Sequence, residues 1–383
     1  MKILIIRNYP SYMDVRNNTY NIQEVGLAKA LVRKGHQCDV LFWTQGIEES
    51  VKIDVDDVGS ITIFYKKGFT KLKNTVFLDS DKLFEQYDIL QPCEYNQIES
   101  WLLAKEYPNK TVVYHGPYYS EFNKRYNLMC SFFDLFFVKR YIKLGTKFIA
   151  KSTLAGSFLE SKGIKKANIK SIGVGIDAQM LTTSANTDIS FYASMKEKPD
   201  VLKILYIGRF EKRRNIPFIM DVFSEVLKHN PDAELYMIGT GEQDLLKTYF
   251  AHASELGIKE KITWQEKMPQ KYLSSIYSAA DFFLLPTEYE IFGMVLLEAM
   301  FYHNVVVTNQ NGGSSTIVDN GENGIIMDRL DSKDWADKIL SIYNDKVRMN
   351  RIKENASNKI RNDFTWDALS SEFIGQYVDR MEN

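Results

Sequence analysis

The chain has 383 residues, too many for one ordinary domain and suited to two of roughly 150–200 residues each. Its net charge of −1 argues against bulk nucleic-acid binding, which calls for a strongly basic surface. No apolar stretch approaches the ~18 residues of a membrane span, and three widely spaced cysteines (Cys38, Cys93, Cys130) form no C-x-x-C pair, as is typical of reduced thiols in a cytoplasmic protein.

The first half, residues 1–177, alternates apolar runs with amphipathic stretches. It opens with Lys2-Ile3-Leu4-Ile5-Ile6, a continuous apolar run of the kind found in strands buried on both faces of a parallel sheet. Further strands are expected near 38–43, 60–65, 111–114, 147–150 and 169–172. This alternation predicts an α/β domain with a doubly wound, Rossmann-like parallel sheet and right-handed crossovers.

A basic, aromatic stretch runs from Lys124 to Lys151 and holds a single acid, Asp134. Its aromatic and apolar residues fall at helical spacing and its basic residues flank them, which allows two interpretations. One is a helix that faces the core and has a solvated basic rim. The other is an interfacial helix that rests on anionic lipid and reaches a lipid-linked acceptor. The aromatic and apolar residues are Phe132, Phe133, Phe136, Phe137, Tyr141 and Leu144. The flanking basic residues are Lys139, Arg140, Lys143 and Lys147.

A polar, irregular stretch at 178–200 predicts a linker, and residues 201–363 repeat the organisation of the first half. Lys203-Ile204-Leu205-Tyr206-Ile207 opens this second domain much as residues 2–6 open the first. Strands are expected near 233–238, 261–264, 282–285, 304–308 and 324–326, and a helical tail at 364–383. The sequence therefore predicts two Rossmann-like domains that face each other across a central cleft.

Ligands bind beyond the carboxyl ends of the strands in open α/β sheets. That rule selects the residues that follow Arg7, Tyr114, Ile207, Ile238 and Leu285.

The segment after the strand at 282–285 carries the strongest functional signal. Glu290 and Glu298 lie eight residues apart in a stretch that reads as the start of a helix, so one acid could face the head of a ligand and the other its tail. Between them, Phe292-Gly293-Met294 would present free backbone N–H groups and a positive helix end to a phosphate. Such a site could hold a nucleotide-sugar at both ends. The alternative is a helix whose N-terminal acid is favoured by the macrodipole and whose second acid lies in solvent.

The stretch from Asp281 to Glu298 resembles the E-x7-E signature of the family 4 glycosyltransferases, a large retaining family with the GT-B fold. Shorter pieces along nearly the whole chain match that family in the same order. They are Leu27-Ala28-Lys29-Ala30-Leu31, Lys34-Gly35-His36, Tyr114-His115-Gly116, Val174-Gly175-Ile176-Asp177, Ile207-Gly208-Arg209-Phe210, Ile238-Gly239-Thr240-Gly241-Glu242 and Asn311-Gly312-Gly313.

The resemblance implies a donor site. Arg209 would bind the donor diphosphate together with Arg214, which stands where the family usually has Lys; Arg can fork onto two phosphate oxygens. Glu298 would accept hydrogen bonds from the ribose and Glu290 from a hydroxyl of the donor sugar. His115 would touch the donor sugar and help to position the leaving group. The further donor-binding residues are Gly208, Gly239, Thr240, Met268, Ile291, Phe292, Gly293, Met294 and Val295.

The chain departs from the family at three places. The usual Gly-Gly pair of the first domain falls on Asn18-Thr19, which predicts a different loop path with Tyr20 or Asn21 at the acceptor. Glu266-Lys267-Met268 replaces a stretch in which the family often has glycine before the backbone that contacts the nucleotide base, so the identity of the base is not predicted. Thr316 stands where the family often has an acid. We also expect Tyr118 on the acceptor side. The loop Gly239-Thr240-Gly241 has a second interpretation, a plain strand–helix turn that needs glycine.

The sequence thus predicts a retaining hexosyltransferase that uses a nucleotide-sugar, UDP-sugar before GDP-sugar, and a glycan or lipid-linked acceptor in cell-surface polysaccharide or glycolipid synthesis. Asp79-Ser80-Asp81 reads D-x-D, but it lies far from the donor residues, so no metal or other cofactor is expected. We expect a cytoplasmic protein at the inner face of the cell membrane. Two alternatives remain: a non-catalytic partner subunit and a GT-B sugar-nucleotide epimerase.

Overall fold

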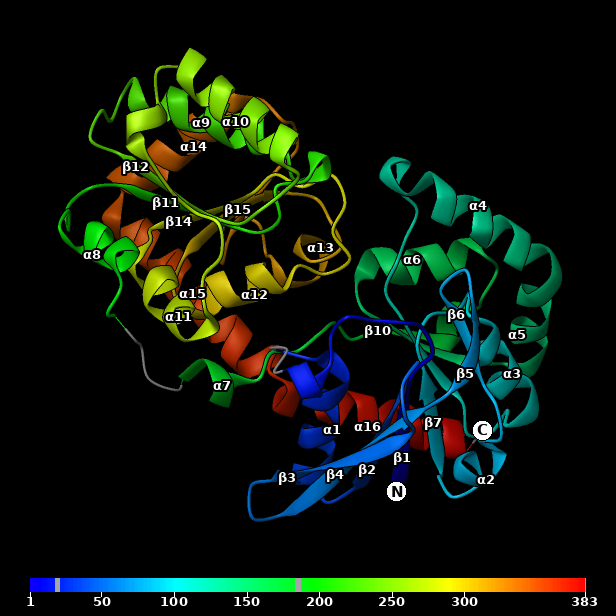
Figure 1. Ribbon diagram of the computed structural model, residues 1–383. Helices are drawn as coiled ribbons and strands as arrows, with labels where there is room; N and C mark the ends of the chain where they lie inside the picture. The colour runs from blue at the N-terminus through cyan, green and yellow to red at the C-terminus, as the bar shows by residue number, and fades with distance from the viewer. Residues whose placement is uncertain (18–20, 183–186, 383) are drawn as a thin grey trace. The chain divides into compact units, whose positions relative to one another are not determined.

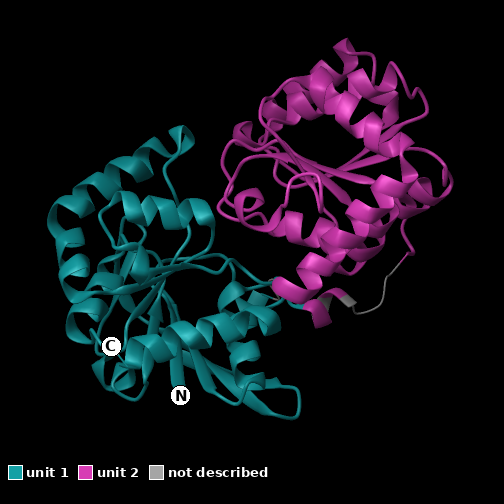
Figure 2. Ribbon diagram, turned by 180° about the vertical axis from the view of Figure 1, so that it is seen from behind, with its two compact units in different colours: residues 1–177, 364–383 teal, residues 178–363 magenta. Residues whose placement is uncertain are grey.

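The computed structural model describes residues 1–17, 21–182 and 187–382 and divides the chain into two compact units (Figures 1 and 2). Unit 1 comprises Met1–Asp177 and Phe364–Asn383, and unit 2 comprises Ala178–Asp363. No helix among the described residues is both long and apolar enough to cross a membrane.

Unit 1 is built on a mainly parallel sheet covered by helices. One sheet has the order β3-β4-β2-β1-β7 and another the order β10-β9-β8, and isolated bridges from Leu90 to Thr111 and from Cys93 to Tyr114 join β7 to β8. Strand β3 is antiparallel to β4, and β5 and β6 form a separate hairpin. The strands are β1 (Lys2–Arg7), β2 (Gln37–Trp43), β3 (Glu49–Val55), β4 (Gly59–Lys66), β5 (Gly68–Lys71), β6 (Asn74–Phe77), β7 (Ile89–Pro92), β8 (Val112–His115), β9 (Lys147–Ala150) and β10 (Ile169–Ser171).

The helices of unit 1 include one from the far end of the chain. Helix α16 packs against α1, where Arg33 pairs with Asp367, and its Tyr377 hydroxyl donates to Gln91 of β7 at 2.6 Å. The helices are α1 (Gln23–Arg33), α2 (Asp81–Phe84), α3 (Ile98–Glu106), α4 (Lys124–Phe133), α5 (Lys139–Leu144), α6 (Thr153–Ser161) and α16 (Trp366–Glu382), and a π-helical turn at Asp134–Val138 joins α4 to α5.

Unit 2 has a six-stranded, wholly parallel sheet of order β13-β12-β11-β14-β15-β16. Its central strands are continuous apolar runs because helices cover both faces. The strands are β11 (Lys203–Ile207), β12 (Glu234–Ile238), β13 (Ile262–Gln265), β14 (Phe282–Leu285), β15 (Val305–Asn309) and β16 (Ile325–Met327). The helices are α7 (Ala178–Thr182), α8 (Ser190–Lys196), α9 (Ile216–Leu227), α10 (Gln243–Glu255), α11 (Gln270–Ala279), α12 (Met294–Phe301), α13 (Ser314–Ile317), α14 (Ser332–Asn344) and α15 (Lys346–Asp363).

Each strand expected from an apolar run is present within a residue or two of its predicted ends, and the predicted α/β class is confirmed. Strands β3, β5, β6 and β7 were not expected. The stretch 178–200, predicted as an irregular linker, carries the short helices α7 and α8 and clusters with unit 2. It is not wholly irregular, because Phe191 and Met195 on α8 are buried.

Candidate functional site

In unit 1, three ionisable side chains meet beyond the carboxyl ends of β7, β8 and β9. His115 ends β8 and its Nδ1 lies 2.8 Å from Glu94 Oε2, which also accepts the Gly116 N–H at 3.0 Å. Lys151, which follows β9, places Nζ 3.5 Å from Glu94 Oε1. The imidazole is fully buried, and its Nε2 has no hydrogen-bond partner among the described residues.

Burial and pairing act in opposite directions on this cluster. Burial alone would raise the pKa of Glu94, but Lys151 and His115 outweigh it and hold that pKa below its ordinary value. Burial alone would lower the pKa of Lys151, but Glu94 and the other acidic groups nearby raise it. Glu94 also has a positive φ of 64°, an uncommon conformation for a non-glycine residue. The fold thus keeps a charged carboxylate beside His115 at the cost of backbone strain.

A second buried ion pair lies at the end of β1. Arg7 forks onto both carboxylate oxygens of Glu24 in α1, and its third donor reaches the Met13 carbonyl at 2.6 Å. Its guanidinium also lies 4.0 Å from the centroid of the Phe42 ring. Burial opposes both charges, yet each partner stabilises the other, so the pKa of Arg7 is raised and that of Glu24 is lowered.

The residues predicted on the acceptor side are described in part. Asn18, Thr19 and Tyr20 lie outside the described residues. Tyr118 is described and buried in the loop that follows β8, while its neighbour Tyr119 is exposed and donates its hydroxyl to Glu121 at 2.5 Å.

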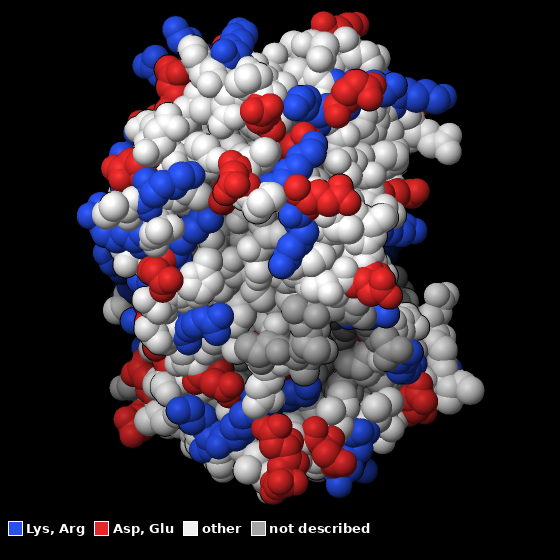
Figure 3. Space-filling view, turned by 90° about the vertical axis from the view of Figure 1, so that its left-hand side faces the viewer, with Lys and Arg blue, Asp and Glu red and all other residues white. Residues whose placement is uncertain are grey.

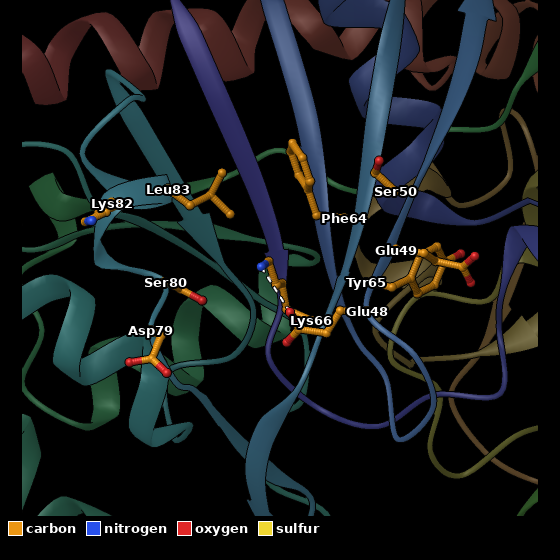
Figure 4. Close-up of a pocket in the computed structure, with 10 residues that line it drawn as sticks. All are labelled: Glu48, Glu49, Ser50, Phe64, Tyr65, Lys66, Asp79, Ser80, Lys82 and Leu83. Carbon is orange, nitrogen blue, oxygen red and sulfur yellow. Dashed lines mark hydrogen bonds and ion pairs between the residues drawn. The ribbon is translucent and has the colours of Figure 1, made fainter.

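The D-x-D segment borders an open pocket of about 500 Å³ at the edge of the unit 1 sheet (Figure 4). Asp79 and Ser80 line it with Glu48, Glu49 and Lys66, and Lys66 pairs with Glu48 at 3.1 Å. Asp79 and Glu49 lie on opposite sides of the pocket. Within residues 1–17, 21–182 and 187–382, no three His, Cys, Asp or Glu side chains converge as metal ligands would.

In unit 2, two glycine-bearing loops lie against each other beyond β11 and β12. A Cβ on Gly239 (φ 154°) would come within 1.8 Å of the Gly208 carbonyl oxygen, and one on Gly241 within 2.3 Å of the Phe210 carbonyl oxygen. The Phe210 N–H donates to the Thr240 carbonyl at 2.8 Å. Close packing between the loops is therefore enough to require Gly239 and Gly241.

Beyond β14, Glu290 meets two arginines from the segment after β11. Its Oε2 pairs closely with Arg214 Nη1 and lies 3.6 Å from Arg213 Nη1. Arg213 also donates to the Tyr289 carbonyl at 2.6 Å and to Glu211 Oε2 at 2.9 Å. The structure thus brings the predicted residues Arg214 and Glu290 together.

The loop that carries Glu290 is clamped from behind by Gly312 and Gly313. The Gly312 N–H donates to the Glu290 carbonyl at 3.0 Å. A Cβ on Gly312 would come within 2.1 Å of the Ile291 carbonyl oxygen, and one on Gly313 within 1.7 Å of the Phe292 carbonyl oxygen. Only glycine allows this approach, which fixes the Glu290 backbone before any ligand binds.

The helical spacing predicted for the two acids was wrong. Helix α12 begins only at Met294, after Gly293 in the left-handed region (φ 82°), so Glu290 and Ile291 precede the helix. Glu298 alone is helical, and it is buried and accepts the Tyr277 hydroxyl at 2.9 Å. The N-cap residue of α12 is Gly293, which has no side chain to accept from the first N–H groups of the helix.

The remaining predicted donor residues differ in accessibility. The Arg209 side chain is 72% exposed, and its Nε lies 3.2 Å from Glu211 Oε1. Met268, Met294 and Val295 are half-buried, and Thr240 donates to Glu266 at 3.2 Å. On the face shown in Figure 3, acidic and basic side chains are interspersed.

Sequence reasoning missed Glu94 and Arg213 and placed Lys151 only in a basic stretch. Glu94 follows β7, a four-residue strand that ends in Gln91-Pro92 and gives little apolar signal. Had that strand been recognised, the strand-end rule would have selected Glu94. Arg213 lies beside Arg214, and only the fold shows that both face Glu290.

Residues 191–359 match the family model described as "Glycosyl transferases group 1". Two curated relatives match slightly less than half of the chain: a D-inositol 3-phosphate glycosyltransferase of Corynebacterium aurimucosum (27% identical over 46% of this chain) and a mannosylfructose-phosphate synthase of Agrobacterium fabrum (25% over 45%). The matched segment spans less than half of these relatives, 43% and 39% of their length.

Solved structures match along the whole chain. HepE of Anabaena, crystallised with UDP and glucose, superposes with a TM-score of 0.71 at 15% identity and covers 99% of this chain and all of that one. The sucrose-phosphate synthase of Thermosynechococcus elongatus gives 0.69 at 16% identity, with 99% of both chains covered. The chain has the GT-B fold. The residues that match the group 1 model lie within unit 2.

Proposed function

We propose that this GT-B protein is a retaining glycosyltransferase that moves a hexose from a nucleotide-sugar, UDP-sugar before GDP-sugar, to a glycan or lipid-linked acceptor in cell-surface polysaccharide or glycolipid synthesis. The observation that carries the proposal is the Arg213–Arg214–Glu290 cluster, which lies inside the matched group 1 domain. A sugar diphosphate needs cations for its leaving group and an acceptor of hydrogen bonds for its sugar. This cluster supplies both at one point.

In the proposed complex, the donor diphosphate takes Arg214 from its pair with Glu290. Arg214 then balances the charge that develops as the glycosidic C–O bond breaks, and the start of α12 adds its N–H dipoles. Arg209, which is exposed, contributes to binding of the diphosphate. Glu290, freed from Arg214, accepts a hydrogen bond from a hydroxyl of the donor sugar, and Glu298 accepts hydrogen bonds from the ribose hydroxyls. Fixed cations can neutralise the diphosphate without a metal ion, so we expect turnover that EDTA does not abolish.

The reaction is written as substitution on one face of the sugar. The acceptor oxygen forms its bond to the anomeric carbon on the side from which the diphosphate leaves, and the departing phosphate oxygen takes the acceptor proton. The products are the glycosylated acceptor, with the configuration retained, and a nucleoside diphosphate.

His115 is proposed to contact the donor sugar through Nε2, the nitrogen without a partner among the described residues. Glu94 is then a positioning residue, since it holds Nδ1 and so fixes the tautomer at Nε2. A Glu94→Gln variant should lower kcat and change its pH profile, because the neutral amide cannot balance the charge of Lys151. An unchanged pH profile would reduce Glu94 to a structural role.

The test is nucleotide release from UDP-, GDP-, ADP- and dTDP-sugars, with and without EDTA. Wild type is compared with Glu290→Ala and with Glu288→Ala, an exposed acid two residues away. We expect EDTA-resistant turnover of one donor, lost by a factor of about 10²–10³ in Glu290→Ala and kept in Glu288→Ala. If no donor is bound or turned over, the proposal fails and a non-catalytic partner subunit takes its place; conversion of the donor to an epimer without acceptor would favour an epimerase.

A further inference from the structure

Helices α4 and α5 with the π-helical turn between them form one continuous helix that exposes an apolar stripe. Leu128, Phe132, Leu135 and Phe136 are each 60–69% exposed. Their spacing of four, three and one places them on one face of the helix. Figure 1 shows α4 and α5 along the outer side of unit 1. Large apolar side chains that gather on one exposed face indicate an interaction surface.

The fold of unit 1 does not use this stripe, because the opposite face of the same helix packs on the core. Phe133, Val138 and Tyr141 are buried, and the Tyr141 hydroxyl donates to the Tyr95 carbonyl at 2.9 Å. Phe137 contacts Trp101 of α3 edge-on, with 4.9 Å between ring centroids. One set of aromatics therefore anchors the helix and the other faces outward, a division that helical spacing alone could not reveal.

The charges around the stripe are mostly basic. Lys124 and Arg125 lie exposed at its beginning, where Glu121 lies 4.0 Å from Lys124, and Lys139, Arg140 and Lys143 lie exposed at its end. Asp134, the one acid between these groups, is half-buried and turned to the core side, where it pairs with Lys162 at 2.6 Å and accepts the Tyr95 hydroxyl at 3.0 Å.

We propose that this surface, residues 119–143, docks unit 1 on the face of an anionic lipid bilayer. Phe132, Leu135 and Phe136 would enter the boundary between headgroups and acyl chains, and the lysines and arginines would meet lipid phosphates. An apolar stripe with cations at both ends suits this partner, because the hydrophobic and electrostatic contributions to bilayer binding add. Tyr119 (61% exposed) and Phe122 (48%) extend the apolar surface ahead of α4.

This docking goes beyond the transfer reaction and is independent of it, since it requires no donor. It would hold the unit that carries His115 at the surface where a lipid-linked acceptor is embedded.

The test is flotation of the purified full chain with vesicles of phosphatidylcholine alone or mixed with phosphatidylglycerol. We expect the protein to float with the mixed vesicles, to stay behind with phosphatidylcholine alone, and to be released by salt. The double variant Phe132→Ser/Phe136→Ser should lose at least about tenfold in partitioning, since bilayer binding scales with the apolar area inserted. The double variant Lys139→Glu/Arg140→Glu should also bind mixed vesicles at least about tenfold more weakly than wild type. Each basic residue near the membrane surface contributes roughly fivefold to binding.

Matched controls separate the stripe from general stickiness. Phe69→Ser removes a phenyl ring that is as exposed as Phe132, both 63%, but lies on β5. Lys34→Glu/Lys52→Glu reverses two exposed lysines on other elements of unit 1. Both controls should float like wild type, and all variants should keep the wild-type unfolding temperature. Failure of wild type to float, or equal flotation of the Phe132/Phe136 variant, would overturn the proposal. A concentration-dependent dimer that this variant converts to monomer would assign the stripe to a second copy of the chain instead.

Discussion

Each unit holds an arginine–glutamate pair near the carboxyl edge of its parallel sheet, yet the two pairs are built differently. In unit 1 Arg7 is buried and every direction of its guanidinium is used, by both oxygens of Glu24, the Met13 carbonyl and the Phe42 ring. In unit 2 Glu290 faces two guanidinium groups, and the buried Nε of Arg214 has no hydrogen-bond partner among the residues that the structure describes. In the first pair one arginine serves one carboxylate, whereas in the second two arginines share one carboxylate.

The difference indicates which pair serves the fold and which serves a ligand. A buried and fully satisfied pair specifies structure and has nothing to offer a substrate. A carboxylate with two cations can release one of them to a phosphate and remain compensated by the other. We therefore expect substitutions in the first pair to change stability and substitutions in the second to change activity.

The largest effect is expected from Arg7→Met, which leaves Glu24 buried without its principal partner. Loss of one member of a buried pair costs about 3–5 kcal/mol in the free energy of unfolding. Urea denaturation measures this cost. The double variant Arg7→Met/Glu24→Leu should recover most of the loss, because apolar replacement of both members is often neutral. If the double variant is as unstable as the sum of the single variants, the pair is not a closed structural unit.

Arg214→Gln tests the opposite expectation for unit 2. We expect kcat for nucleotide release to fall by about 10²–10³-fold, as on loss of a group that stabilises transition-state charge. The free energy of unfolding should change by about 1 kcal/mol or less, because Arg213 still lies 3.6 Å from Glu290. A large loss of stability with little change in kcat would assign this pair to the fold as well.

How far the sequence predicts the structure depends on where its apolar residues stand. Central strands such as β11 and β14 are continuous apolar runs because both their faces are covered, and these were predicted. Strand β3 is an antiparallel edge strand with alternating exposure, and β5 and β6 are four-residue strands of a hairpin. Such strands depend on their partners more than on their own composition, so the sequence did not reveal them.

The candidate site shows the same limit. Arg214 and Glu290 follow strands of one sheet, so the strand-end rule predicts their proximity. The rule does not predict how they meet, because the Glu290 loop is shaped by the close approach of Gly312 and Gly313 from beyond β15. The environment of His115 depends likewise on Glu94 in a left-handed conformation after the unrecognised strand β7.

Glu99 extends the comparison to a buried carboxylate whose charged neighbours are acids. Burial raises its pKa to about 8, and Asp81 and Glu106 add to the rise. Because the folded pKa lies above the ordinary value of 4.5, Glu99 stabilises the fold fully below pH 4.5, and this contribution is lost as pH rises to about 8. The loss amounts to about 1.4 kcal/mol for each pH unit in that window.

Glu99→Gln should therefore flatten the decline of stability between pH 5 and about 8, and the variant should be the more stable protein at the upper end. Urea unfolding at a series of pH values measures the slope. Glu160→Gln, an exposed acid on α6 of the same unit, is the control and should keep the slope of wild type. Parallel slopes for wild type and Glu99→Gln would show that Glu99 is ionised in the folded protein, as Glu24 is.

The smallest effect is expected from Arg209→Ala, which separates exposed from enclosed cations within unit 2. Arg209 is 72% exposed and its pair with Glu211 is screened by water, so the free energy of unfolding should change by less than about 0.5 kcal/mol. A solvent-exposed contact between Arg209 and the donor diphosphate should contribute little more than this to the free energy of binding. We therefore expect a rise of about two- to fivefold in the KM for the donor and little change in kcat. Initial rates over a range of donor concentrations separate the two constants. A loss of kcat equal to that of Arg214→Gln would mean that the bound donor encloses Arg209 as fully as Arg214, and accessibility in the unliganded chain would then not distinguish the cations that act on the leaving group.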